Sequence, residues 1–221
     1  MAIAERMLKQ AWDSGTRAMI LTPHFNPGRF PVFGEEVERG WHLLQEKAKK
    51  IHPEFRLYLG NECKYHSDSC DHMESGTCRS MAGSRYMLVE FGVQESVKKI
   101  RRSLYNVSLA GFRPILAHAE RYQALRKDYE GIAELIDGGV AIQVNAGSIA
   151  GREGWHTARF VRKLLAYEMI HFIGSDAHED TARTPILSDC AAYIEKKYGE
   201  DYVRELMWEN PSRIWRDEDL F

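Results

Sequence analysis

The sequence predicts an α/β fold, specifically a β/α barrel in which parallel strands alternate with helices. Short apolar runs typical of buried parallel strands alternate with longer segments of helical periodicity. Polar side chains that can bind metal ions follow most of the apolar runs directly. Because the carboxyl ends of barrel strands meet at one rim, where active sites lie, we expect these side chains to converge.

The predicted elements follow one another along the whole chain. A helix with one apolar face covers residues 3–14 and ends at Gly15. Strands are expected at residues 18–21, 55–59, 86–89, 114–117, 141–144 and 170–173. Helices are expected at residues 34–50, 94–109, 127–137 and 153–167, and from about 186 to 216 with an interruption at Asn210–Pro211. The chain shows no repeat or linker composition, so residues 1–221 are expected to form one domain.

The composition excludes several classes of protein. Acidic residues number 32 and basic residues 30, and this near balance argues against a nucleic-acid-binding protein, which needs a basic face. No stretch approaches the ~20 consecutive apolar residues of a membrane span. The N-terminus also lacks the pattern of a signal peptide, so we expect a cytoplasmic protein.

Three of the four cysteines, Cys63, Cys70 and Cys78, lie close together with His66 and His72 between them. This clustering raises the possibility of a structural zinc site. The gaps are wider than the paired spacing of such sites, however. We therefore prefer reduced, partly exposed thiols in a cytosolic protein.

The side chains at the strand ends are of the types that bind metal ions. Taken singly, each is more often a solvated or hydrogen-bonded residue than a ligand. Their shared position on one predicted rim favours a metal site instead, formed by His24, Glu62, Glu90, His118, Asp176 and His178. Histidine and carboxylate ligands suit zinc, manganese or iron. Six ligands are too many for one four-coordinate ion, so we expect two or more ions, which activate water and neutralise an anionic substrate.

Two arginines stand where a phosphate group would need them. Arg121 follows His118 by three residues and Arg183 follows His178 by five. A guanidinium group can form two parallel hydrogen bonds to the oxygens of one phosphate group. Each arginine could equally form an ion pair with a nearby acidic residue on the surface. The sequence contains no P-loop, no G-x-S-x-G elbow and no C-x(5)-R loop. Phosphate chemistry here would therefore depend on metal.

Several short motifs occur in an order that resembles the bacterial metal-dependent protein-tyrosine phosphatases of the polymerase and histidinol phosphatase (PHP) superfamily. These phosphatases are associated with capsule and exopolysaccharide regulation. The motifs are Thr22–Pro23–His24, Gly60–Asn61–Glu62, Leu88–Val89–Glu90–Phe91, Ala117–His118–Ala119–Glu120–Arg121–Tyr122, Ser175–Asp176–Ala177–His178 and Glu209–Asn210–Pro211. The resemblance implies a distorted seven-stranded barrel holding up to three divalent ions, often manganese, with iron, zinc or magnesium as alternatives.

The resemblance also implies a role for each candidate residue. Glu62 would bridge two ions, with Asp176 on the first and with Glu90 and His118 on the second. His24 and His178 would hold the third ion. Arg121 and Arg183 would clamp the phosphate while a metal-bridging hydroxide attacks phosphorus and expels the tyrosine phenolate.

The chain departs from the family pattern at its start. Family members open with a strand that carries His-x-His, and nothing similar precedes Met1–Ala2–Ile3. We expect that the first barrel strand is missing, either because about 20 residues are omitted, the length of one βα-loop stretch, or because the protein is a degenerate descendant. The uncapped first helix favours omission. Activity would then be impaired, and the unpaired strand edges would favour self-association.

Two other functions stay open at this point. The first is a non-catalytic protein that binds phosphotyrosine, for example on the tail of a bacterial tyrosine kinase, through Arg121 and Arg183. The second is a small-molecule phosphatase of the histidinol phosphatase type. The His118–Ala119–Glu120–Arg121–Tyr122 run favours the protein-tyrosine phosphatase, whose partner would be a phosphotyrosine protein.

Overall fold

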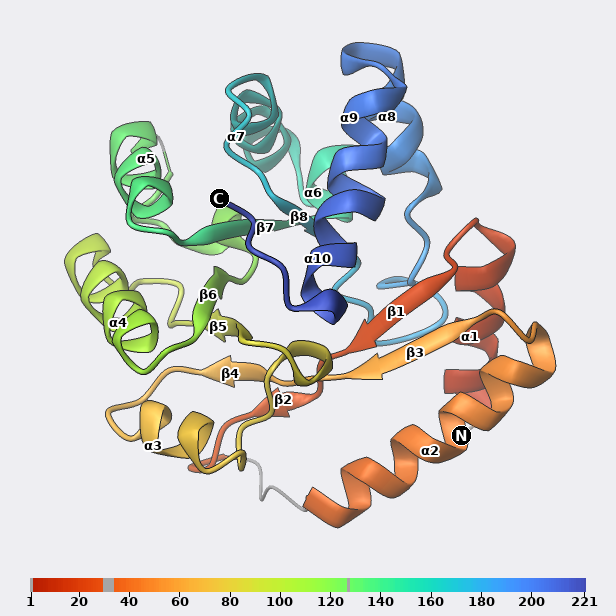
Figure 1. Cartoon of the computed structure of the whole chain (residues 1–221). Coiled ribbons are helices and arrows are strands. Elements are labelled where there is room, and N and C mark those ends of the chain that lie inside the picture. Colours follow the sequence, from red (N-terminus) through yellow and green to blue (C-terminus); the bar gives the residue numbers. More distant parts are fainter. Residues whose placement is uncertain (1, 30–33, 127) are drawn as a thin grey trace.

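The computed structural model describes residues 2–29, 34–126 and 128–221, which form a curled sheet surrounded by helices (Figure 1). All strand pairings are parallel, so the carboxyl ends of the strands lie at one rim. The order is β1–β3 in a two-stranded sheet and β2–β4–β5–β6–β7–β8 in a six-stranded sheet. The strands are β1 Ala18–Leu21, β2 His24–Phe25, β3 Arg56–Leu59, β4 Glu62–Lys64, β5 Tyr86–Glu90, β6 Arg113–Leu116, β7 Ala141–Asn145 and β8 Phe172–Gly174.

Helices cover the outer side of the sheet, and the C-terminal helix lies across its inner side (Figure 1). The helices are α1 Ala2–Asp13, α2 Gly34–Ile51, α3 Ser69–Glu74, α4 Val97–Leu109, α5 Tyr129–Asp137, α6 Ala146–Ala150, α7 Trp155–Ala166, α8 Ser188–Tyr198, α9 Glu200–Arg204 and α10 Asn210–Arg216, with 3₁₀ turns η1 Met81–Gly83 and η2 Ala119–Arg121 and the π-helix η3 Glu205–Glu209. Across the ranges that the structure describes, no helix has both the length and the apolar character needed to cross a bilayer.

The alternation of side chains along β5 shows how the fold aims polar groups at the inner side of the sheet. Met87 and Val89 belong to the large outer core, which α4, α5 and α7 cover. Tyr86 and Leu88 belong to a smaller inner cluster that includes Ile214 of α10. Because side chains alternate between the two faces of a strand, Glu90 continues the inner set at the rim.

Two strands of the rim, β2 and β4, were not predicted as separate elements. They continue β1 and β3 after short breaks at Thr22–Pro23 and Gly60–Asn61. Pro23 cannot donate to a strand ladder, which accounts for the first break. Backbone bonds span both breaks: Gly60 N donates to Leu21 O at 2.9 Å and Glu62 N to Pro23 O at 3.2 Å. His24 therefore lies directly opposite Glu62.

The α/β prediction is confirmed, and the sheet is a curled half-barrel rather than a closed one. Among the described residues, β1 pairs only with β3, β2 pairs only with β4, and β8 pairs only with β7. No pairing therefore joins β8 to β1 or β2 in this part of the chain. The count of seven barrel strands, the missing first strand and self-association through open edges stay predictions.

Most of the predicted elements are present, with shifted bounds. The strand expected at 170–173 spans Phe172–Gly174. The helix expected from 94 begins at Val97, where the Ser96 hydroxyl accepts from Lys99 N at 3.3 Å. The short helices α3 and α6 were missed, and the start of the helix expected from 127 lies outside the described residues. The interruption expected at Asn210–Pro211 was misplaced: these two residues begin α10, and the π-helix that precedes it ends at Glu209. A second break, at Gly199 between α8 and α9, was not expected.

Candidate metal centre

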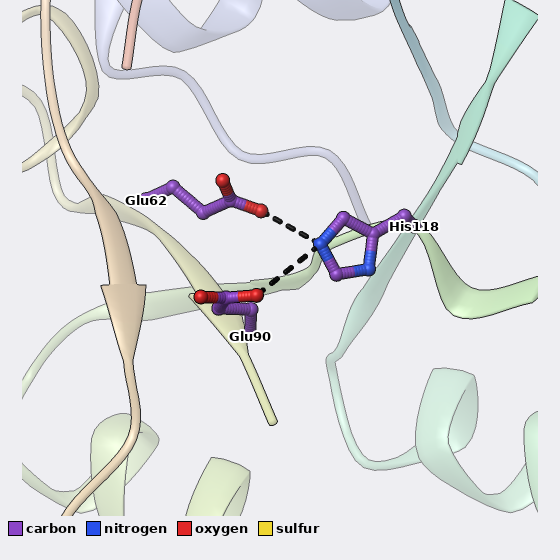
Figure 2. A group of neighbouring side chains, drawn as sticks. All are labelled: Glu62, Glu90 and His118. Carbon is purple, nitrogen blue, oxygen red and sulfur yellow. Dashed lines mark hydrogen bonds and ion pairs between the residues drawn. The ribbon is translucent and has the colours of Figure 1, made fainter. Parts of the chain in front are cut away.

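Three side chains converge on the inner side of the rim, each from a different strand. Glu62 begins β4, Glu90 ends β5, and His118 follows β6 by two residues. Figure 2 shows one imidazole nitrogen of His118 facing both carboxylates. His118 Nε2 lies 2.7 Å from Glu62 Oε1 and 3.5 Å from Glu90 Oε2. One ligand atom from each residue lies within 4.8 Å of the others, which places three potential ligands around one point.

The electrostatics of this group favour a bound cation. Glu62 and His118 are only 6% and 5% exposed. Burial alone would lower the pKa of His118, but hydrogen bonds with Glu62 and Glu90 outweigh it and raise that pKa to about 9. Burial would raise the pKa of Glu62, but His118 and His24 hold it well below its usual range. A divalent ion can take the place of the proton on His118, since two carboxylates and an imidazole are suitable ligands.

His24 and His178 extend the group towards solvent. His24 Nδ1 lies 3.1 Å from Glu62 Oε2 and 3.9 Å from Glu90 Oε1. The hydrogen bond with Glu62 raises the pKa of His24 against the effect of partial burial. The rings of His24 and His178 are 5.6 Å apart between centroids, and both side chains are about two-fifths exposed. The structure thus brings both predicted histidines to the site, on its open side.

Asp176 lies outside the three-ligand group and holds the two arginines instead. Arg121 and Arg183 both form ion pairs with Asp176 Oδ2. The Asn145 amide donates to the same oxygen at 3.0 Å. Burial lowers the pKa of Arg121, but the carboxylate of Asp176 more than compensates, so the guanidinium stays charged. The structure therefore brings the two predicted phosphate-binding residues together on one carboxylate, 55 positions from Arg121 in the sequence.

The sequence analysis gave no role to three polar residues around the site. Gln143 and Asn145 are buried on β7, and Glu120 is fully buried in η2. Glu120 Oε1 accepts from Asn145 N at 2.9 Å and from the Ser148 hydroxyl at 2.7 Å. The signal for the first two was the alternation along β7, where Ile142 and Val144 face the outer core and Gln143 and Asn145 face inwards.

Residues of the site line a cavity of about 760 Å³ on the inner side of the sheet. Side chains of β1, β8 and α10 line its apolar part. Its polar lining includes Glu62, His118 and Asp176. The cavity makes the metal-capable group accessible to a ligand of small-molecule or side-chain size.

The cysteines do not contribute to this centre. All four are free thiols, and within the described ranges the only group of three metal-capable side chains contains no cysteine. The predicted partial exposure is correct for Cys70 and wrong for Cys63 and Cys78, which are buried. Those two pack in the outer core between the sheet and its helices, which is why they are inaccessible.

Comparison with known proteins connects this geometry to a family. The family described as "Capsular polysaccharide synthesis, CpsB/CapC" matches residues 1–216. The chain belongs to the CpsB/CapC family. The resemblance predicted from the short motifs is thereby confirmed.

Curated CpsB/CapC relatives are named as phosphatases. The tyrosine-protein phosphatase CpsB of Streptococcus pneumoniae is 28% identical over 220 residues, covering 97% of this chain and 90% of that protein. The tyrosine-protein phosphatase YwqE of Bacillus subtilis is 26% identical over 215 residues, covering 97% and 84%.

Solved structures with a similar fold include one of a tyrosine phosphatase and one of a dihydropyrimidinase. A structure from work on YwqE of Bacillus subtilis and CpsB of Streptococcus pneumoniae, described as metal-dependent tyrosine phosphatases, has a TM-score of 0.90 and 25% identity, and covers 100% of this chain and 89% of its own. A dihydropyrimidinase from Brevibacillus agri has a TM-score of 0.59 at 10% identity, covering 97% of this chain and 66% of its own, and shows the fold alone.

Proposed function

We propose that this member of the CpsB/CapC family is a metal-dependent protein-tyrosine phosphatase. The observation that carries the proposal is the convergence of Glu62, Glu90 and His118, whose ligand atoms lie within 4.8 Å of one another in a largely buried pocket. The names of the curated relatives and of the similar solved structure support the same activity. His24 and His178, on the open side, and Asp176 are proposed as further ligands.

A divalent ion bound here supplies Lewis-acid chemistry, lowering the pKa of water and neutralising phosphate charge. Manganese is our first choice because the family resemblance implies it. Two carboxylates and one imidazole also suit iron or zinc, and magnesium is a further alternative. The chain's own contribution is to hold these donors in a buried position and to keep the imidazole facing the carboxylates.

Arg121 and Arg183 are proposed to bind the phosphate of the substrate. Both guanidinium groups already meet at one carboxylate oxygen of Asp176, so they can approach a single anionic group together. In the reaction, an oxygen of water forms the new bond to phosphorus. The bond from phosphorus to the tyrosine oxygen breaks, the phenolate takes up a proton, and inorganic phosphate is released.

The substrate is proposed to be a phosphotyrosine protein, such as the tail of a bacterial tyrosine kinase, in the cytoplasm. The four free thiols are in keeping with a reducing compartment. The CpsB/CapC description also connects the family to capsular polysaccharide synthesis.

The test compares chelator-treated protein with and without added Mn²⁺ on a phosphotyrosine peptide and on histidinol phosphate. We expect Mn²⁺-dependent phosphate release from the peptide, at a higher kcat/KM than from histidinol phosphate. The Glu62→Gln variant should lose this activity, while Glu46→Gln, at an exposed position of α2, should keep it. Peptide binding without turnover at saturating Mn²⁺ would refute the phosphatase, and preference for histidinol phosphate would refute its specificity.

A further inference from the structure

The inner face of β7 carries two amide side chains at the point where its neighbours carry apolar ones. Ala141 packs in the inner cluster, but Gln143 and Asn145, further along the same face, are polar and only 9% and 2% exposed. Gln143 Oε1 accepts from the backbone N–H of His118 at 2.6 Å. Gln143 Nε2 donates to Asn145 Oδ1 at 3.4 Å, and Asn145 Nδ2 donates to Asp176 at 3.0 Å. One chain of amide contacts thus runs from His118 to Asp176.

Both residues at the ends of this chain have an unfavourable backbone conformation. His118 has φ 35° and Asp176 has φ 50°, in the left-handed region that favours glycine. That region is unfavourable for a non-glycine residue, so the surrounding contacts must hold the backbone in place. Among the described residues His118 Nδ1 is buried without a hydrogen-bond partner. The backbone of His118 makes two hydrogen bonds: its N–H donates to Gln143 Oε1 at 2.6 Å, and its carbonyl accepts from Arg121 N at 2.9 Å. Gln143 is thus the side chain that holds the His118 backbone from the neighbouring strand β7.

The neighbouring strand leaves a space for this arrangement. Gly174 of β8 lies opposite Asn145 in the parallel register. A Cβ atom at Gly174 would lie 2.1 Å from Gln143 Nε2 and 3.2 Å from Gln143 Cδ. Gly174 is not among the glycines with positive φ, so an alanine would suit its backbone and would clash only with the amide of Gln143.

We propose that Gln143 and Asn145 form a positioning bridge that fixes His118 and Asp176 relative to each other, and that Gly174 provides the room for it. The bridge rests on the proposed function, because it acts by holding two residues of the metal site. Neither amide is proposed to touch the substrate. They act by fixing the positions of His118 and Asp176, just as hydrogen bonds to the ligands of other metal sites alter the affinity of those sites for the metal.

The experiment measures Mn²⁺ affinity by calorimetry for Gly174→Ala, Gln143→Ala, Asn145→Ala and the double variant Gly174→Ala/Gln143→Ala. Each single variant should weaken Mn²⁺ binding about 10- to 100-fold, the usual effect of removing support behind a ligand. The double variant should bind no more weakly than Gln143→Ala, because the clash disappears with the amide. Asn210→Ala is the matched control: it removes a buried amide that donates to His171 O at 3.1 Å, and it should lower the melting temperature without weakening Mn²⁺ binding.

A second readout needs no metal, so it separates the bridge from the proposed function. Hydrogen exchange of the His118 amide should be slow in the metal-free wild type and in Asn210→Ala, and fast in Gln143→Ala and Gly174→Ala. If the wild type fails to bind Mn²⁺ but this exchange pattern holds, the proposed function is wrong and the bridge stands. Unchanged protection of His118 in Gln143→Ala, or wild-type Mn²⁺ affinity in Gly174→Ala, would overturn the bridge.

Discussion

Replacing Glu62 with glutamine should change how the stability of the metal-free protein depends on pH. The group concerned is His118, whose Nε2 lies 2.7 Å from Glu62 Oε1 in a buried position. Its pKa is raised from 6.5 to about 9 in the folded chain. Since one pKa unit corresponds to about 1.4 kcal/mol, protonated His118 contributes on the order of 3 kcal/mol to the free energy of unfolding.

The sign follows from the direction of that pKa change. The folded state binds the proton more tightly than the unfolded state, so the contribution is fully present below pH 6.5 and is lost as the pH rises through about 9. In Glu62→Gln the hydrogen bond that raises the pKa of His118 most is lost, and only Glu90 remains as a carboxylate partner, at 3.5 Å. We therefore expect the pKa of His118 to fall back towards its ordinary value. The free energy of unfolding of the variant should therefore depend much less on pH between about 6.5 and 9 than that of the wild type.

The assay is urea unfolding of chelator-treated protein at several pH values between about 6 and 9.5, a range set by the two His118 pKa values. Through His118 the wild type should lose on the order of 3 kcal/mol more than Glu62→Gln across this range. The loss of the hydrogen bond between Glu62 and His24, which raises the pKa of His24, adds to the difference in the same direction. Glu46→Gln, an exposed change on α2, should follow the wild type. Parallel curves for the wild type and Glu62→Gln would refute the idea that Glu62 holds the proton on His118.

Three further predictions follow from other parts of the structure. Burial lowers the pKa of His171 to about 4, and its Nδ1 accepts from Ile142 N at 3.0 Å. Its stabilising contribution is therefore present above pH 6.5 and lost towards pH 4, by on the order of 3 kcal/mol, and His171→Gln should flatten that part of the unfolding curve. Arg183→Ala should lower kcat/KM on a phosphotyrosine peptide about 10²- to 10³-fold while leaving Mn²⁺ affinity nearly unchanged, as steady-state kinetics and calorimetry will show. Gly60→Ala should destabilise the fold by about 1–3 kcal/mol, seen in the melting temperature, because its Cβ would lie 3.0 Å from Met81 Cα and Sδ.

The sequence predicted those site residues that directly follow an apolar run. Glu90 and His118 come directly after apolar runs, and parallel strands bring their carboxyl ends to one rim. The short strand β4 could not be predicted in the same way. Gly60–Asn61 has the composition of a strand end, but the chain continues in extended conformation beyond it, as β4. Hydrogen bonds to a neighbouring segment carry the ladder across it, and no local pattern shows them.

Contacts between distant segments could not be predicted from spacing. Arg121 and Asp176 lie 55 positions apart, and their ion pair depends on how the sheet curls. Gln143 and Asn145 alternate with apolar residues along β7, but their bonds to His118 and Asp176 join separate segments of the chain, and the sequence does not show those bonds.

The most direct test of the metal centre is anomalous scattering from crystals of the protein soaked in Mn²⁺. A manganese peak is predicted about 2.2 Å from Glu62, Glu90 and Nε2 of His118, a distance typical of oxygen and nitrogen ligands. It should be absent from Glu90→Gln crystals treated in the same way. A peak elsewhere in the wild-type protein, with none between these three side chains, would contradict the assignment of the metal centre.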